Sequence, residues 1–266
     1  MTKEDLLNTE QMAEFVNQGF VRLDEVIPKD LCNEVIEQFE TDGPGSKGGL
    51  NKPLSRVWPD EHPVRRMIYH PKVMGAIESL VGPDPLYDHC AVHKRAGNSP
   101  HAQFLHQDAE IDMREDAFDI QISFFVQDVP LEMGGTRFLP GSHFRRVHES
   151  VIARYQQVKG MYQVVCKAGT VLFWHHNLWH GAQPNHTDVL RYMFKLRLNP
   201  TVKQQLLWNT DDLKDTDVGK YLFKPQLWYG QENRIEQFNR TRMWRFLTNN
   251  PKYDVGWFTR IENEPN

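Results

Sequence analysis

Cysteine is scarce in this sequence. The three cysteines, Cys32, Cys90 and Cys166, are odd in number and far apart, which argues against the paired framework of a small disulfide-stapled domain. None of them has the close spacing that a structural zinc site with thiolate ligands needs. We therefore expect a protein of the reducing cytoplasm whose fold does not depend on disulfide bonds.

Positive charge and long apolar runs are lacking as well. The net charge of −4 provides no basic field for nucleic acid or for an anionic membrane. No apolar run approaches the ~18 residues that span a bilayer, and the N-terminal residues lack the apolar core of a signal peptide. The sequence predicts neither a nucleic-acid partner nor a membrane partner.

The spacing of apolar residues divides the 266 residues into three parts of one expected domain. Residues 1–85 carry helical patterns and a loop rich in glycine and proline at 42–55, which is a candidate lid. Residues 86–198 form a β core, and residues 199–266 form a C-terminal extension with helical patterns.

The β core consists of short apolar runs separated by glycine and proline. This pattern favours a sandwich or barrel over a parallel α/β sheet, so the expected fold class is mainly β with flanking helices. The predicted strands are 86–94, 120–129, 136–139, 162–166, 170–174 and 191–198.

Three side chains within this core form a candidate metal site. His106 and Asp108 are separated by one residue, so both project from the same face of an extended strand. His180 is the candidate third ligand. Two imidazoles and one carboxylate leave coordination positions open, which suits non-haem iron(II) that binds a cosubstrate and dioxygen together. A closed structural zinc site would need a fourth protein ligand.

Arg191 follows His180 and opens a strand with clean alternation. Tyr192, Phe194 and Leu196 face one side of this strand, and Arg191 faces the other. A guanidinium donates two parallel hydrogen bonds to a carboxylate. Arg191 is therefore suited to bind the far carboxylate of a cosubstrate beside the metal.

The order of several short motifs resembles the phytanoyl-CoA dioxygenase family over roughly residues 10–198. The motifs are Gly19-Phe20-Val21, His106-Gln107-Asp108, Phe124–Asp128, Met133–Thr136, Leu139–His143, His180-Gly181 with Asn185, and Arg191. The resemblance implies a double-stranded β-helix, a cupin-like jelly-roll barrel flanked by helices. It also implies iron(II), 2-oxoglutarate as cosubstrate and dioxygen.

Site residues follow from the resemblance position by position. His106, Asp108 and His180 resemble the iron ligands, and Arg191 looks like the residue that binds the far carboxylate of 2-oxoglutarate. The resemblance also places three side chains near the cosubstrate, namely His93, Phe124 and Gln107, although Gln107 could equally point away from the metal.

Two further positions bear on activity. Many relatives have a serine where Ala182 stands, so one hydrogen bond to the cosubstrate, worth ~0.5–1.5 kcal/mol, is expected to be missing. Halogenases built on this scaffold replace the carboxylate ligand by a small residue. The presence of Asp108 therefore favours hydroxylation over halogenation.

Basic and aromatic residues near the strand ends are weaker candidates. Those that flank the core strands are candidate substrate contacts: Arg56, Trp58, Lys94, Arg95 and Arg137. Others are expected in loops or on solvated faces: His175, His176, Arg240, Arg242 and Arg245.

The sequence thus predicts an iron(II)- and 2-oxoglutarate-dependent dioxygenase that hydroxylates a small molecule and releases succinate and CO2. Two alternatives stay open. One is a cupin-fold hydrolase or isomerase that uses zinc or manganese, and the other is a non-catalytic barrel that binds a metal or ligand. The identity of the substrate cannot be read from the residues.

Overall fold

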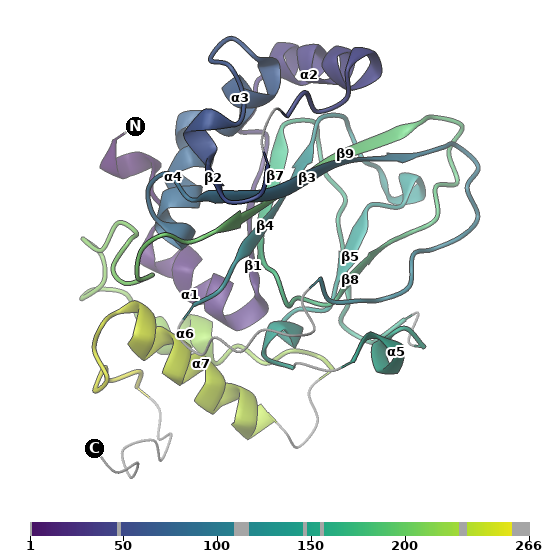
Figure 1. Ribbon diagram of the computed structural model, residues 1–266. Coiled ribbons are helices and arrows are strands. Elements are labelled where there is room, and N and C mark those ends of the chain that lie inside the picture. Colours follow the sequence, from purple (N-terminus) through teal and green to yellow (C-terminus); the bar gives the residue numbers. More distant parts are fainter. Residues whose placement is uncertain are drawn as a thin grey trace.

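Two antiparallel sheets form the centre of the computed structural model, which describes residues 2–46, 49–108, 117–145, 148–154, 157–228 and 233–256. The large sheet has the strand order β1 (Phe20–Leu23), β7 (Thr170–His175), β4 (Ile120–Phe125), β9 (Arg191–Asn199), β3 (Leu86–Arg95) and β2 (Lys52–Pro53). The small sheet has the order β6 (Tyr162–Gln163), β5 (Thr136–Phe138) and β8 (His180–Ala182). β5 and β8 lie on the side of the large sheet away from α1 and α4 (Figure 1).

The helices surround this centre. They are α1 (Thr9–Gln18), α2 (Lys29–Thr41), α3 (Pro63–Ile68), α4 (Pro71–Val81), α5 (Glu149–Ile152), α6 (Val218–Leu222) and α7 (Asn233–Leu247), with short 3-10 turns at Lys3–Asp5, Leu54–Arg56, Leu131–Met133 and Ser142–Phe144. In the described part of the chain, no helix combines the length and the apolar character needed to cross a bilayer.

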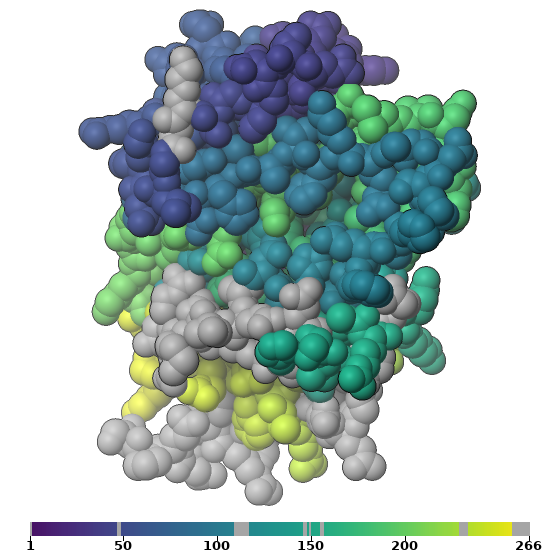
Figure 2. All heavy atoms as spheres, turned by 45° about the vertical axis from the view of Figure 1, so that its right-hand side comes forward, coloured from purple at the N-terminus to yellow at the C-terminus, as the bar shows by residue number. Residues whose placement is uncertain are grey.

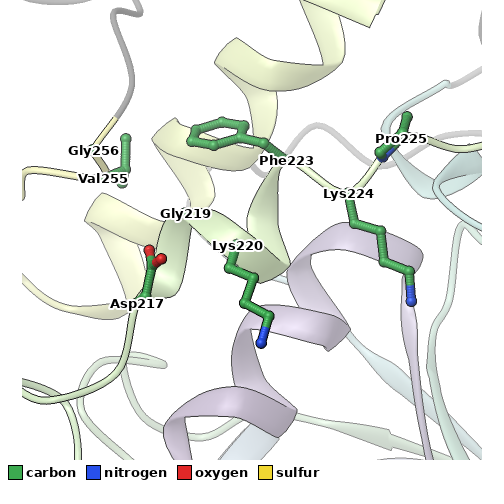
Figure 3. Close-up of a pocket in the computed structure, with 8 residues that line it drawn as sticks. All are labelled: Asp217, Gly219, Lys220, Phe223, Lys224, Pro225, Val255 and Gly256. Carbon is green, nitrogen blue, oxygen red and sulfur yellow. The ribbon is translucent and has the colours of Figure 1, made fainter.

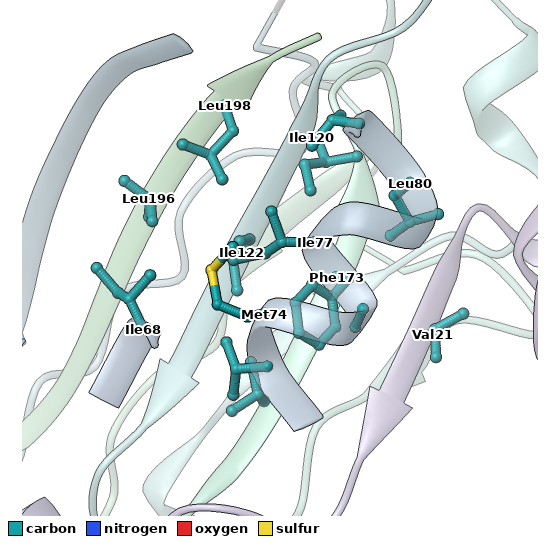
Figure 4. Packing of buried hydrophobic residues seen from close by; sticks show 14 of the residues in the cluster. Val21, Ile68, Met74, Ile77, Leu80, Ile120, Ile122, Phe173, Leu196 and Leu198 are labelled. Atoms are coloured by element: carbon teal, nitrogen blue, oxygen red, sulfur yellow. The ribbon is translucent and has the colours of Figure 1, made fainter. Parts of the chain in front are cut away.

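Side-chain alternation gives the large sheet two different faces. The helix face carries Ile122, Phe173 and Leu196, which pack against Met74 and Ile77 of α4 (Figure 4). The opposite face, called the inner face below, turns toward the small sheet, and its apolar members Phe20, Leu172, Trp174 and Phe125 pack with Phe138 and Val164. The polar residues of the inner face are the ones that concern function.

The predicted fold class, mainly β with flanking helices in a double-stranded β-helix, is confirmed. All six predicted core strands are present. Two are shorter than predicted, since 120–129 ends at Phe125 and 162–166 ends at Gln163. β8 was not predicted, because three residues with a glycine at the centre carry no alternation. Within the predicted loop 42–55, Lys52 and Pro53 form a short edge strand against β3; residues 47–48 lie outside the described residues.

Candidate metal centre

His106, Asp108 and His180 meet at one point between the two sheets. The backbone of His106 pairs with that of His180 in an isolated antiparallel bridge, which brings the two histidine rings to a centroid distance of 4.1 Å. One ligand atom from each of the three residues lies within 4.8 Å of the others. The predicted trio is therefore assembled by an added strand pairing at the edge of the small sheet.

Both histidines direct the same nitrogen toward this point. Nδ1 of His106 lies 2.9 Å from the carbonyl oxygen of Phe104, and Nδ1 of His180 lies 3.0 Å from that of Leu178. A carbonyl only accepts, so each Nδ1 carries a hydrogen, and in the neutral ring Nε2 then keeps its lone pair. The Nε2 atoms lie 3.5 Å and 3.7 Å from the oxygens of Asp108. Two neutral imidazole nitrogens and a carboxylate fit a divalent transition metal.

Electrostatics keeps the trio in the protonation states that a metal needs. Burial lowers the pKa of His180 to about 3, so this ring is neutral at neutral pH. Burial alone would raise the pKa of Asp108, but His180, the contact with His106 and the Lys195 ammonium hold it well below its ordinary value. Because His180 is neutral at neutral pH, the Lys195 ammonium is the cation beside Asp108 that keeps this carboxylate ionised.

Arg191 lies on the inner face with 3 % of its surface exposed. Its Nη1 donates to the carbonyls of Met133 and Gly134, whereas its Nε is buried and has no hydrogen-bond partner. No carboxylate among the described residues forms an ion pair with it, and burial lowers its pKa to about 10. A buried cation with an unused donor is arranged to receive an anion.

His93 connects Arg191 with the trio. It pairs with Met193 across β3 and β9, between the positions of Arg191 and Lys195. Burial, and then the field of Lys195, lower its pKa to about 4, while Asp108 acts in the opposite direction. A neutral imidazole therefore lies between the guanidinium and the carboxylate, where the sequence predicted a polar contact to the cosubstrate.

Phe124 requires a correction. It pairs with Phe194 across β4 and β9, and the two rings are 5.6 Å apart in the cluster on the helix face. Side chains alternate along a strand, so the members of β4 that face inward are Gln121, Ser123 and Phe125. Phe124 is a core residue and does not line the site.

Gln107 also points away from the trio. Its amide nitrogen donates to the carbonyls of Arg145 and Asn177, and the residue is 4 % exposed. The middle residue of His-Gln-Asp thus anchors the segment to neighbouring loops. Of the two orientations that the sequence left open for Gln107, beside the cosubstrate or away from the metal, the structure has the second.

The candidate substrate contacts separate into two groups. Arg56 is exposed, Trp58 packs edge-on against Tyr87 and Phe194, and Lys94 lies on the helix face and donates to the carbonyl of Phe39. None of these three lines the inner face. Of the five candidates, Arg95 pairs directly with Arg191 on that face.

Arg137 has a structural position. It is 1 % exposed, and its guanidinium donates to the carbonyl of Gln103 at 3.1 Å. It therefore ties the segment before His106 to β5. Next to it, the amide oxygen of Gln103 accepts from the N–H of Ala182, and its amide nitrogen lies 3.5 Å from Nε2 of His106. A side-chain amide thus stands beside Ala182, where relatives carry the serine.

Several buried polar residues were expected in loops or at the surface. His175 and His176 are 7 % and 0 % exposed and stack on each other beside Phe118. Arg240 is fully buried and donates to the carbonyl of Leu222, which joins α7 to α6. The predicted exposure of these residues was wrong, because His175 packs against Phe15 and Phe118, and Arg240 joins two C-terminal helices. These contacts are between segments far apart in the chain, so no local pattern indicates them.

Sequence reasoning missed two partners of Asp108. Lys195 forms an ion pair with its Oδ2 at 2.8 Å, and Gln121 donates to the same oxygen. The alternation of β9 offered a signal, because Lys195 follows Arg191 by four residues and therefore shares its face. For Gln121 no local signal existed.

A pocket of about 500 Å³ lies beside α6, away from the metal centre. Figure 3 shows its lining, which includes Asp217, Lys220, Phe223 and Lys224. It contains no residue of the trio and none of the predicted site residues. Figure 2 shows one face of the molecule, on which the blue part of the chain, which includes β3, forms much of the surface.

Comparison with known proteins agrees with this geometry. The family model described as phytanoyl-CoA dioxygenase (PhyH) matches residues 15–193. The matched range contains the trio and Arg191, and it ends inside β9.

Solved structures show the same fold at low sequence identity. SnoK, a non-haem alpha-ketoglutarate-dependent carbocyclase from nogalamycin biosynthesis, is 20% identical with a TM-score of 0.57, covering 75% of this chain and 86% of its own. HygX from Streptomyces hygroscopicus with nickel and 2-oxoglutarate bound is 16% identical with a TM-score of 0.55, covering 73% and 88%. EctD from S. alaskensis is 19% identical with a TM-score of 0.56, covering 75% and 79%.

Proposed function

Because this chain belongs to the phytanoyl-CoA dioxygenase family, we propose that it is an iron(II)- and 2-oxoglutarate-dependent oxygenase that hydroxylates a small molecule and releases succinate and CO2. The observation that carries the proposal is the trio of His106, Asp108 and His180 together with the buried guanidinium of Arg191, whose Nε has no hydrogen-bond partner. A three-ligand metal site and a buried cation with an unused donor together match a cosubstrate that is both a metal chelator and a dicarboxylate.

The bound iron and 2-oxoglutarate would supply the oxidising chemistry, since protein side chains cannot activate dioxygen by themselves. The chain supplies positions and charges. His106, Asp108 and His180 would hold the metal through Nε2, a carboxylate oxygen and Nε2. Nε of Arg191 would donate to the far carboxylate of the cosubstrate. His93 lies opposite Met193, between the positions of Arg191 and Lys195 on β9.

Aromatic packing keeps the distal histidine in place and water away from it. The ring of Trp174 lies 4.4 Å from the ring of His180, and Phe138 lies 6.3 Å from it on the same side. The indole N–H of Trp174 donates to Ser123, which satisfies its polar atom within the core. His180 can therefore neither rotate nor be replaced by solvent without breaking these contacts.

The outcome of the oxidation is proposed as hydroxylation. Asp108 occupies the carboxylate position of the trio, so no coordination position is vacated for halide. Arg95, beside Arg191 on the inner face, is the candidate that we retain as a substrate contact.

The test uses purified protein with iron(II) and 2-oxoglutarate. Without oxygen, we expect a visible charge-transfer band that needs both components. With oxygen, we expect succinate, whose formation is faster when a substrate is present in a metabolite screen. Asp108→Ala is the control and should lose both signals. A parent protein that gives neither the band nor succinate would refute the proposal.

A further inference from the structure

We propose that Lys195 and Gln121 are positioning residues that hold one oxygen of the Asp108 carboxylate, so that only its other oxygen faces a bound metal ion. This inference rests on the proposed function, because it concerns the same metal centre. It identifies two side chains that determine how many coordination positions remain for the cosubstrate and dioxygen.

Both side chains reach Asp108 from the inner face of the large sheet. Gln121 pairs with Arg197, and Ser123 pairs with Lys195, so Gln121 and Lys195 are diagonal neighbours on adjacent strands of the inner face. Nζ of Lys195 lies 2.8 Å from Oδ2 of Asp108, and Nε2 of Gln121 donates to the same oxygen. Two donors on rigid strands thus converge on one carboxylate oxygen.

Burial makes these contacts consequential. Gln121 is 0 % exposed, and the side chains of Lys195 and Asp108 are 12 % and 17 % exposed. A buried ammonium needs a counter-charge, and Asp108 supplies it. Arg197, by contrast, forms its shortest ion pair with Asp119 at 2.7 Å.

The Gln121 amide directs its nitrogen toward Asp108, and its oxygen is left without a hydrogen-bond partner. Its Oε1 is buried and has no hydrogen-bond partner, which costs about 1–3 kcal/mol for such a group. The opposite orientation would place this oxygen against the carboxylate and cost more. The hydrogen bond to Oδ2 of Asp108 therefore determines the orientation of the Gln121 amide.

Oδ1 of Asp108 is left for the metal. Its neighbour is Nε2 of His106 at 3.5 Å. In the neutral ring, whose Nδ1–H faces the carbonyl of Phe104, this nitrogen carries a lone pair. Oδ2 lies 3.7 Å from Nε2 of His180, but it already accepts from Lys195 and Gln121. Oδ1 is therefore the oxygen of Asp108 whose lone pairs are left for a metal.

The number of ligand oxygens matters for the chemistry. Two imidazoles and one carboxylate oxygen leave half of an octahedral site open, which a chelating cosubstrate and dioxygen would fill together. If both oxygens of Asp108 bound the metal, the position needed for dioxygen would be lost. Holding Oδ2 is thus a condition for the proposed reaction, not only for metal binding.

The test measures cobalt(II) binding to the parent protein, Gln121→Leu and Lys195→Met. Gln121→Leu changes no charge, so it isolates positioning, and we expect its cobalt(II) affinity to fall roughly 10- to 100-fold. Lys195→Met also removes a charge that repels the metal, so its readout is the visible d–d spectrum. We expect lower band intensity as the freed carboxylate chelates the ion through both oxygens.

Lys94→Met is the matched control, because Lys94 lies on the opposite face of the same sheet and donates to Phe39 instead. It should keep the parent spectrum and affinity. Circular dichroism checks folding; if one variant fails to fold, the other carries the test. Parent-like affinity in Gln121→Leu or a parent-like spectrum in Lys195→Met would overturn the inference. Failure of the parent to bind cobalt(II), or to change its spectrum with 2-oxoglutarate, would count against the proposed function instead.

Discussion

At the scale of single residues, each histidine of the metal centre is oriented by one local hydrogen bond. Each donates Nδ1–H to the carbonyl two positions earlier in the chain, which fixes the ring and leaves Nε2 as the donor atom. A backbone carbonyl is always available on an extended strand. The tautomer of each ligand is therefore set locally, while their meeting depends on the pairing of His106 with His180.

Replacing Arg191 by methionine tests the anion site. Truncating one partner of a buried charged hydrogen bond costs about 2–4 kcal/mol, so we expect the affinity for 2-oxoglutarate to fall roughly 30- to 1,000-fold. Binding is measured by calorimetry on the metal-loaded protein. Arg191→Lys keeps the charge but loses the two-pronged donor, so its loss should be smaller. Unchanged affinity in Arg191→Met would move the carboxylate contact elsewhere.

Gly19 shows how one element determines the position of another. It ends α1 with a positive φ of 85°, and its N–H donates to the carbonyl of Phe15. A Cβ at this position would lie 2.6 Å from Nδ1 of His143 and 2.8 Å from Cδ1 of Leu178. The turn from α1 into β1 therefore needs glycine both for its backbone angle and for the space.

Gly19→Ala and Gly43→Ala form a matched pair. Both glycines have a positive φ, but a Cβ at Gly43 meets no atom within 4 Å. Left-handed backbone strain costs about 1–2 kcal/mol in either variant, and overpacking adds about 1–3 kcal/mol at Gly19 only. Urea denaturation should show the larger loss of unfolding free energy for Gly19→Ala. Equal losses would mean that His143 and Leu178 move aside without cost.

β9 carries two cations of the site. Arg191 and Lys195 lie on its inner face, and Phe194 and Leu196 lie on its helix face. A shift of its register by one residue would turn both cations into the apolar core. The apolar residues of β9 thereby determine which face its charged residues occupy. The alternation in the sequence was enough to predict this face for Arg191.

His143 depends on the packing of the whole molecule. It is enclosed by the end of α1, by His175 at the end of β7 and by the field of Arg240 from α7. Burial, and then the field of Arg240, lower its pKa to about 3. The folded protein therefore holds a neutral imidazole that the unfolded chain would protonate in mild acid.

Acid should weaken the fold through this group. The unfolded value is near ~6.5, so between that pH and about 3 the unfolded chain binds more protons, and stability falls as the pH is lowered. From pH 7 to pH 5 the contribution of His143 is about 2 kcal/mol. Denaturation at both pH values should show a smaller decrease for His143→Phe than for the parent. His101→Gln, at an exposed position, should retain the parental decrease.

Metal binding should stabilise the whole molecule, because the ligands come from the segment before residue 109 and from β8, while Lys195 on the large sheet holds Asp108. A ligand at 100 times its dissociation constant adds about 2.7 kcal/mol to the free energy of unfolding. We expect cobalt(II) to raise the melting temperature of the parent and not of His180→Ala. A melting temperature indifferent to cobalt(II) at saturating concentration would contradict this coupling.

The sequence by itself determined the β core, the flanking helices and the pairing of His106 with Asp108, because alternation and spacing are local properties. His180 was identified through the order of motifs, since its short strand carries no alternation. Alternation turned Gln107 and Phe124 away from the site, whereas similarity of position had suggested otherwise for Phe124. Only the tertiary structure decided that Lys195 and Gln121 converge on Asp108 and that His175, His176 and Arg240 are buried. These contacts join strands and helices far apart in the chain, and burial depends on what covers a residue rather than on its neighbours in sequence.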